Sequence, residues 1–272
     1  MLKLTAPRVI AFSAYWYRKL ELDEAVFART NTALAKALQN GKQLTRAELL
    51  TLLQQASVAT SDLFRFTYIM MRAELDAVVC SGGMRGKQHT YALLDERVPQ
   101  AHPLERDEAL AELAKRYFTS RGPATLKDYI WWSGLTAADA RTGLEMVKSQ
   151  LVSEVVDGQA FWLAASMSPV PNSALSAYLL PNYDEYVVGY TDRSAIFDDT
   201  HLPNMDSRAN PLFNNTLIIS GKIAGTWKRT IKKGTIEIEA KPFTSLDEAE
   251  THALAAALTR YSRFMGSPVT LL

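Results

Sequence analysis

The chain has 272 residues, of which 47% are hydrophobic and 22% are charged, as in an ordinary globular protein with two or three small domains. Thirty Lys and Arg residues nearly balance 29 Asp and Glu residues, so an anionic partner has to be met by a local basic patch. The single cysteine, Cys80, excludes an internal disulfide framework and a cysteine-rich zinc site. No apolar run reaches the roughly 18 residues of a membrane span, and the N-terminus lacks a signal-peptide pattern, so we expect a cytoplasmic protein without membrane association.

Helix starts are indicated by hydroxyl and carboxylate side chains three residues apart, because each can bond the other's free amide in the first helical turn. The four pairs are Thr45 with Glu48, Thr125 with Asp128, Thr136 with Asp139, and Ser245 with Glu248. Apolar residues at helical spacing extend and supplement these starts. The predicted helices cover residues 23–40, 45–55, 61–79, 107–120, 125–133, 136–150 and 245–265.

A β-rich segment follows each of the first two groups of three helices. One lies near residues 87–97, and the other is a hairpin near residues 151–164 whose turn is Asp157-Gly158. The glycines of Ser81-Gly82-Gly83 lack the spacing of a phosphate loop and are expected to form a turn before the first β segment. Three helices and a β-wing, present twice, are the layout of the winged helix-turn-helix domain.

The composition changes after residue 165. The stretch "SMSPVPNSALS" predicts a connection, and "AYLLPNYDEYVVGYTDR", "NTLIISGKIAGTWKR" and "GTIEIEAKPF" predict strands, with turns at Gly221 and Lys233-Gly234. The predicted fold class is therefore α+β, with tandem winged helix-turn-helix domains followed by a small antiparallel β-barrel or sheet and a C-terminal helix. The predicted domains are residues 1–100 (an N-terminal segment and the first winged helix), 101–168 (the second) and 169–272 (the β-barrel-like domain).

Two adjacent tryptophans, Trp131 and Trp132, close the second helix of the second winged helix, before Gly134 as a left-handed cap. Helical geometry separates the two rings by about 100°, so they cannot serve the same surface. One is expected to pack in the core against Tyr117 or Phe118. The other is expected to cover a domain seam or to stack on a nucleotide.

The segments "GKQHTYALLDERVP", "RYFTSRGPATLKDYIWWSGL", "YLLPNYDEYVVGYTDR" and "GKIAGTWKRT" together resemble the bacterial winged-helix family that includes the AlkZ and YcaQ DNA glycosylases. The resemblance runs from about residue 20 to the C-terminus. It implies tandem winged helices and a C-terminal β-barrel around a DNA-binding channel, with excision of alkylated bases as the activity of the family's enzymes.

One departure concerns the family's catalytic motif. The resemblance implies a Gln-x-Gln or Gln-x-Asp triplet in a further N-terminal winged helix, and no such triplet occurs in these 272 residues. No catalytic role carries over to a residue of this chain. The chain is thus expected to be a shortened relative or to lack a first domain, and whether it is an enzyme stays open.

Basic residues are the strongest candidates for a site. Residues 220–242 hold six Lys or Arg and two Glu, a local excess of four positive charges that suits a phosphate backbone. A solvated lysine hairpin explains the same residues equally well. The DNA-binding candidates are Arg85, Lys87, His89, Lys127, Arg193, Lys228, Arg229, Lys232 and Lys233.

Catalytic candidates are weaker. Asp184 and Glu185 are adjacent, so in a strand they point to opposite faces and cannot act as an acid/base pair. Asp184 remains as the one carboxylate to test for a catalytic role, although a structural ion pair with Arg193 explains its presence equally well. The four histidines lack zinc-type spacing, and neither a metal nor another cofactor is predicted.

Three classes of function follow. A DNA-repair glycosylase, or its DNA-binding remnant, would bind double-stranded DNA and prefer damaged duplex, because extruding a base costs less where pairing is weakened. A winged-helix transcription regulator would typically dimerise on spaced half-sites. A non-catalytic interaction protein is the third class. The sequence does not indicate the oligomeric state.

Overall fold

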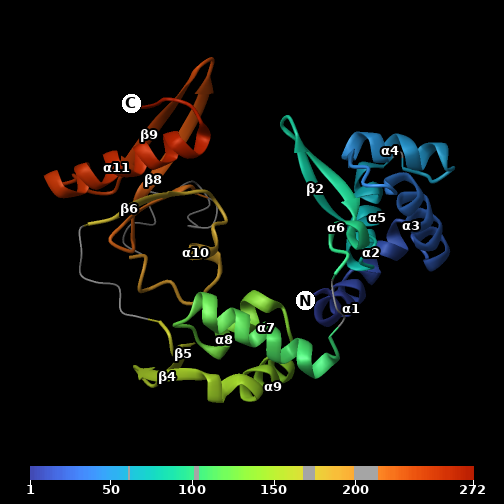
Figure 1. The fold of residues 1–272 in the computed structure, drawn as a ribbon, viewed down its shortest axis with the longest axis horizontal. Helices are drawn as coiled ribbons and strands as arrows, with labels where there is room; N and C mark the ends of the chain where they lie inside the picture. The colour runs from blue at the N-terminus through green and yellow to red at the C-terminus, as the bar shows by residue number, and fades with distance from the viewer. Residues whose placement is uncertain (61, 101–103, 168–174, 199–213) are drawn as a thin grey trace. The chain divides into compact units, whose positions relative to one another are not determined.

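The computed structural model describes residues 1–60, 62–100, 104–167, 175–198 and 214–272, in two compact units, Met1–Leu113 and Ala114–Leu272. Helices and mainly antiparallel sheets share the chain, which confirms the α+β class (Figure 1). The predicted division into three domains is finer than these two units and stays a prediction. No helix in the described part of the chain is long and apolar enough to cross a membrane.

The first unit packs a bundle of helices against a small sheet. Its helices are α1 (Leu2–Phe12), α2 (Ala14–Lys19), α3 (Glu24–Leu38), α4 (Arg46–Gln55), α5 (Leu63–Leu75) and the short α6 (Leu94–Arg97). Its strands are β1 (Leu44–Thr45), β2 (Val79–Arg85) and β3 (Gln88–Leu93), in the order β1-β3-β2. The sequence patterns predicted α3, α4 and α5 but neither α1 nor α2.

The core of this unit follows from the helical spacing of its apolar residues. Leu34 and Leu38 on α3 are fully buried against Leu49 and Leu53 on α4 and Phe66 on α5. Side chains four residues apart lie on one face of a helix, so each helix contributes a single apolar stripe. The hairpin of β2 and β3 extends away from these helices (Figure 1).

The second unit begins within α7 (Arg106–Arg121), which spans the division between the units, and continues with α8 (Leu126–Ser133) and α9 (Ala137–Val147). A 3₁₀ turn (Lys148–Gln150) leads into the hairpin of β4 (Leu151–Val156) and β5 (Gln159–Ala164). The predicted turn is confirmed, because Asp157 and Gly158 both take left-handed backbone angles, with φ of 50° and 77°. Gly134, with φ of 69°, is confirmed as the cap that ends α8.

The rest of the second unit is a five-stranded sheet with a helix packed against it. Its strands are β6 (Ala177–Leu180), β7 (Thr216–Ile219), β8 (Lys222–Lys232), β9 (Thr235–Pro242) and β10 (Val269–Leu271), in the order β10-β9-β8-β7-β6. Neighbouring strands are antiparallel except β9 and β10. Helix α11 (Glu248–Met265) buries Ala253, Leu254 and Ala257 against Leu217 and Ile219 of the sheet. The predicted sheet with a C-terminal helix is therefore confirmed.

Four local expectations are wrong. The β segment predicted near residues 87–97 ends at Leu93, and residues 94–97 form the short helix α6. Helix α11 is capped by Asp247 with Glu250 rather than by Ser245 with Glu248, because the same three-residue spacing recurs two residues later and the side chain of Asp247 accepts the backbone N–H of Glu250 at 2.8 Å. Residues 81–83 belong to strand β2, where the register shifts, and do not form a turn. Residues 185–188 form a single helical turn, α10 (Glu185–Val188), instead of a strand. Residues 168–174 of the predicted connection lie outside the described residues.

Candidate nucleic-acid interface

The hairpin of β8 and β9 carries the densest group of basic side chains. Its base is fixed by Trp227, which is buried against Tyr261 of α11 and donates its indole N–H to the carbonyl oxygen of Leu180 at 2.8 Å. Beyond Trp227, every residue of β8 is exposed. The second half of this long hairpin therefore presents its side chains to solvent, and its turn at Gly234 (φ 84°) places Lys232 and Lys233 at the tip.

The cations of this hairpin fall into two groups. Two lysines form ion pairs, Lys232 with Glu237 at 2.6 Å and Lys241 with Glu239 at 3.0 Å. Arg229 donates to the hydroxyl of Tyr261 at 2.5 Å and forms no ion pair with any described residue. Lys228 and Lys233 form no ion pair or hydrogen bond with any described residue. Alternation along β8 directs Trp227 and Arg229 toward α11, and Lys228 toward the opposite face.

The hairpin of β2 and β3 presents a smaller basic group. The guanidinium of Arg85 lies 2.8 Å from the carboxylate of Glu48 and also donates to the carbonyl oxygen of Gln43 at 2.5 Å. Lys87 and His89 are exposed beside it. Arg85 is thus held and partly neutralised within its own unit, which leaves Lys87 as the freer positive charge of this hairpin.

The glycines of β2 explain how this hairpin joins the helices. The backbone N–H of Gly83 donates to the side-chain oxygen of Gln43 at 2.6 Å, and the hydroxyl of Thr90 donates to the carbonyl oxygen of Gly83 at 2.5 Å. A Cβ at Gly82 would collide with the hydroxyl of Thr90. Small residues are needed here for close backbone approach, not for binding a phosphate.

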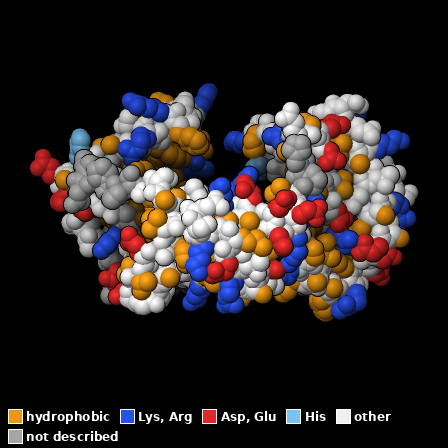
Figure 2. Space-filling model, turned by 60° about the horizontal axis from the view of Figure 1, so that its bottom comes forward, with side chains coloured by type: hydrophobic (Ala, Val, Ile, Leu, Met, Phe, Trp, Pro, Cys, Tyr) orange, Lys and Arg blue, Asp and Glu red, His pale blue; other side chains and the backbone are white. Residues whose placement is uncertain are grey.

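Charge elsewhere on the surface is mixed. On the face drawn in Figure 2, acidic and basic side chains are interspersed over much of the surface. This agrees with the net charge of +1 for the whole chain.

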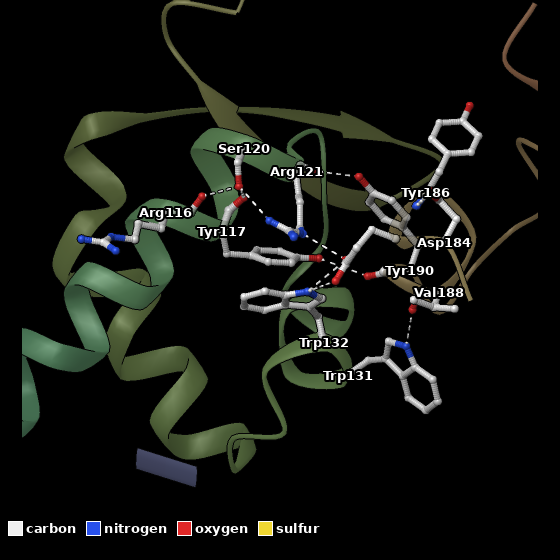
Figure 3. Close-up of polar contacts among 12 residues, drawn as sticks. Arg116, Tyr117, Ser120, Arg121, Trp131, Trp132, Asp184, Tyr186, Val188 and Tyr190 are labelled. Carbon is white, nitrogen blue, oxygen red and sulfur yellow. Dashed lines mark hydrogen bonds and ion pairs between the residues drawn. The ribbon is translucent and has the colours of Figure 1, made fainter. Parts of the chain in front are cut away.

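Within the second unit, the segment Glu185–Thr191 docks on helices α7 and α8. The carboxylate of Glu185 lies 3.2 Å from the guanidinium of Arg121 and accepts the indole N–H of Trp132 at 3.2 Å. The hydroxyl of Tyr190 donates to the carbonyl oxygen of Arg121 at 2.8 Å. These contacts join the helices to the sheet part of the same unit (Figure 3).

Asp128 forms the buried centre of this docking. One carboxylate oxygen accepts from the backbone N–H and hydroxyl of Thr125, at 2.9 and 2.7 Å, and the other accepts from the corresponding groups of Thr191, both at 2.8 Å. Burial alone would raise the pKa of Asp128. The hydrogen bonds from Thr125 and Thr191 outweigh burial and hold that pKa below its ordinary value.

The two tryptophans separate as expected from helical geometry, and Figure 3 shows their rings pointing in different directions. Trp132 packs on Tyr117, with ring centroids 5.0 Å apart, and Arg121 lies 4.7 Å from its ring. Trp131 is 55% exposed and donates its indole N–H to the carbonyl oxygen of Val188 at 2.8 Å. Trp132 is therefore the ring that packs against Tyr117, and Trp131 covers the seam with the docked segment.

The expected ion pair between Asp184 and Arg193 does not form. Asp184 caps α10 by accepting the backbone N–H of Tyr186 at 2.9 Å, and Arg193 donates to the carbonyl oxygen of Val187 at 2.7 Å. Burial lowers the pKa of Arg193, an effect that the charge of Asp128 opposes. Each side chain bonds a backbone group close to it in the sequence instead of forming the ion pair.

The predicted DNA-binding residue Lys127 is exposed in the first turn of α8.

Sequence reasoning missed two features of this unit. It identified Asp128 as a helix cap but not as the acceptor for Thr191, because nothing local indicates a partner 63 residues away. It also missed a groove between β6 and α11, lined in part by Tyr178, Arg260 and Phe264. A signal for the groove exists in the sequence, since residues 257, 261 and 264 lie on one helical face and the last of them, Phe264, is aromatic.

Streptomyces sahachiroi DNA glycosylase AlkZ has a similar fold, with a TM-score of 0.72 and 19% sequence identity, covering 100% of this chain and 76% of that chain. At this identity the similarity concerns the fold.

The sequence itself identifies the family. Residues 2–264 match the family described as DNA glycosylase AlkZ-like, and the chain therefore belongs to the AlkZ-like family of DNA glycosylases. A search of curated proteins finds no match. The family confirms the resemblance found in the sequence and implies DNA as the partner.

Proposed function

We propose that this chain is a DNA-binding protein of DNA repair that contacts the phosphates of double-stranded DNA through the exposed ends of its basic hairpins. The observation that carries the proposal is the outer half of the β8–β9 hairpin. There Lys228 and Lys233 are exposed and form no ion pair or hydrogen bond with any described residue. Phosphates are the anions that such unpaired cations on a DNA-binding protein would meet.

The topology of both units supports winged-helix domains as the frame for these hairpins. In the first unit, β1 lies between α3 and α4 and pairs with β3, the second strand of the hairpin. In the second unit, Ala124 lies between α7 and α8 and pairs with Trp162 on β5, again the second strand of a hairpin. A short strand after the first helix that joins the wing is typical of winged helices, and such wings commonly touch DNA.

Damaged duplex is the preferred form of the partner in this proposal. Removing a base from the stack costs less where pairing or stacking is already weakened, so a repair protein gains selectivity from the damage itself. We assign no catalytic residue within the described part of the chain. Asp184, the one carboxylate that the sequence offered, serves there as a helix cap.

The test measures how DNA affinity depends on salt. Each phosphate contact contributes about 0.9 to the slope of log affinity against log salt concentration. Replacing Lys228 and Lys233 together with glutamine should therefore flatten this slope by about 1.8 and weaken binding equally for unrelated sequences. The variant leaves Trp227 and the folded base of the hairpin intact.

Arg85→Gln is the matched control, because Arg85 is exposed on the other hairpin but already paired with Glu48. We expect it to change the slope by less than either lysine does. An unchanged slope in the double lysine variant would remove the β8–β9 hairpin from the interface. Comparing intact, abasic and alkylated duplexes in the same assay tests the preference for damage.

A further inference from the structure

The groove between β6 and α11 lies on the side of the sheet away from Lys228 and has a volume of about 650 Å³. This volume is within the range of about 300–1,000 Å³ that is usual for small-molecule sites. Trp227, Leu179 and Ala257 lie at its floor and are largely buried. The remaining lining residues are Tyr178, Leu180, Pro181, Asn182, Asn215, Arg229, Arg260, Tyr261 and Phe264.

Two aromatic rings of this groove face solvent. Phe264 is 84% exposed and Tyr178 is 50% exposed, although both border an apolar floor. Helix α11 covers the sheet with Ala253, Leu254 and Ala257, and Phe264 adds nothing to that contact. Aromatic rings left in water beside an apolar floor provide surfaces on which a flat ring can stack.

The charged groups of the groove are arranged for an anion. Arg229 and Arg260 both line it, and its lining, as far as the described residues go, includes no Asp or Glu. Each arginine is already held in place, Arg229 by the hydroxyl of Tyr261 and Arg260 by the carbonyl oxygen of Ala177 and the ring of Tyr178 at 5.2 Å. A guanidinium has five N–H donors, so each arginine still has donors available for a ligand. Because both side chains are already held in place, binding a ligand costs little further side-chain entropy.

A nucleotide combines the two properties that the groove selects, a flat ring and an adjacent anion. Only an unpaired nucleotide can offer the face of its base, because neighbouring bases cover both faces within a duplex. An acidic peptide would satisfy the arginines but not the exposed rings. We propose that this groove binds an unpaired nucleotide in a single-stranded segment of DNA, with the base against Tyr178 and Phe264 and the phosphates near Arg229 and Arg260.

Such a site would be tolerant of sequence, because every base has a face on which an aromatic ring can stack. The exposed side chain of Asn182 at the rim can donate and accept hydrogen bonds, and so would suit the edge of any base. The proposal takes DNA as the partner from the proposed function. It places the unpaired nucleotide on the face of β8 opposite Lys228, so the two sites can be tested separately.

The experiment uses the full chain with fluorescein-labelled oligothymidylate of about 12 nucleotides and with duplex DNA of the same length. Stacking of one base on an aromatic ring is worth about 1–3 kcal/mol, so Phe264→Ala and Tyr178→Ala should each weaken single-strand binding about fivefold or more. Both should leave duplex affinity unchanged. Phe264→Trp should retain single-strand binding, because it preserves the stacking surface.

Phe12→Ala is the matched control, since Phe12 is 87% exposed but lies in the first unit. It should leave single-strand binding unchanged, and all variants should unfold at the temperature of the native chain. The proposal is overturned if Phe264→Ala and Tyr178→Ala bind oligothymidylate as the native chain does, or if Phe12→Ala weakens binding equally. It is also overturned if polyglutamate of matched charge displaces the oligonucleotide as well as unlabelled oligothymidylate does, since the site would then recognise charge alone.

The two proposals fail in different ways. Lys228→Gln with Lys233→Gln should weaken duplex binding and spare oligothymidylate. Duplex binding without single-strand binding by the native chain would overturn the groove proposal and leave the proposed function standing. The reverse result would overturn the hairpin interface and leave the groove. If Phe264→Ala lost affinity for duplex DNA and for oligothymidylate equally, the assignment of the groove to unpaired nucleotides would be overturned.

Discussion

In the first unit, the carboxylate that completes the capping box of α4 belongs to Glu48. This carboxylate is exposed and lies 2.8 Å from the guanidinium of Arg85 on the β2–β3 hairpin of the same unit. In the second unit, the corresponding carboxylate of α8 belongs to Asp128, which is 4% exposed and binds Thr191, 63 residues further along the chain. Both begin as the same signal, a threonine three residues before an acid. The longer Glu side chain extends to the surface, while the shorter Asp stays at the helix and receives a distant segment.

This difference determines how much each acid contributes to the stability of the folded chain. An exposed ion pair such as Glu48 with Arg85 contributes little to stability, because water solvates both charges in the unfolded chain and screens them in the folded one. A buried carboxylate with four hydrogen bonds leaves several donors unsatisfied when it is removed. The docking of Glu185–Thr191 should therefore depend on Asp128.

The largest effect is expected for Asp128→Ala. Loss of the acceptor leaves the buried donors of Thr125 and Thr191 without partners, and we expect the free energy of unfolding to fall by about 3–5 kcal/mol. Urea denaturation measures the change, with Glu48→Ala as the matched variant in the first unit. Similar losses for the two variants would contradict the distinction between the buried and exposed acids.

Acid should weaken the same contact. Because the pKa of Asp128 is lower in the folded chain than its ordinary value of 3.8, its contribution to stability is full above that value and is lost as the pH falls through the folded pKa. Asp128→Asn has no carboxylate to titrate. The stability difference between the native chain and this variant should therefore shrink as the pH falls below about 4. A difference that stays constant from pH 7 to pH 3 would contradict the pKa direction.

The two tryptophans give the next largest contrast. Trp132 packs on Tyr117 and bonds Glu185, so Trp132→Ala should cost about 2–3 kcal/mol of unfolding free energy, less than for a fully buried ring. Trp131 is largely exposed, so Trp131→Ala should cost about 1 kcal/mol, mainly through the lost bond to Val188. Thermal unfolding of the two variants provides the ranking. A larger loss for Trp131→Ala would reverse our account of this helix.

How much the sequence predicted depends on how local each signal is. The capping residues Thr45 and Thr125, the turn at Asp157-Gly158 and the cap at Gly134 are confirmed, because each depends on neighbouring backbone groups. The segment after Asp184 was predicted as a strand from its valines and tyrosines. It forms α10 because its side chains and carbonyl groups dock on α7 and α8, a tertiary effect that overrides β propensity.

The candidate site shows the same limit. The positive excess of residues 220–242 was visible as composition, but the ion pairs of Lys232 and Lys241 depend on which residues face each other across β8 and β9. That register could be predicted only if the turn at Gly234 and the strand ends were known together. The groove beside α11 was not predicted, because it brings together β6, β8 and a helix that are distant in the sequence.

The smallest effect is expected for Asp184→Asn. Excision of an alkylated base needs a group that holds and polarises a water beneath the sugar; the resemblance noted in the sequence analysis implies a glutamine triplet for this role, and these 272 residues contain none. Asp184 already accepts the backbone N–H of Tyr186 at 2.9 Å, and an asparagine oxygen can cap the helix in the same way. We therefore expect the native chain to bind DNA but to excise bases slowly or not at all, and Asp184→Asn to match it in stability, DNA binding and excision. A glycosylase assay on methylated DNA measures both proteins. Robust turnover by the native chain would refute this expectation, and loss of that turnover in the variant would make Asp184 a catalytic residue, because the conservative replacement preserves its structural role.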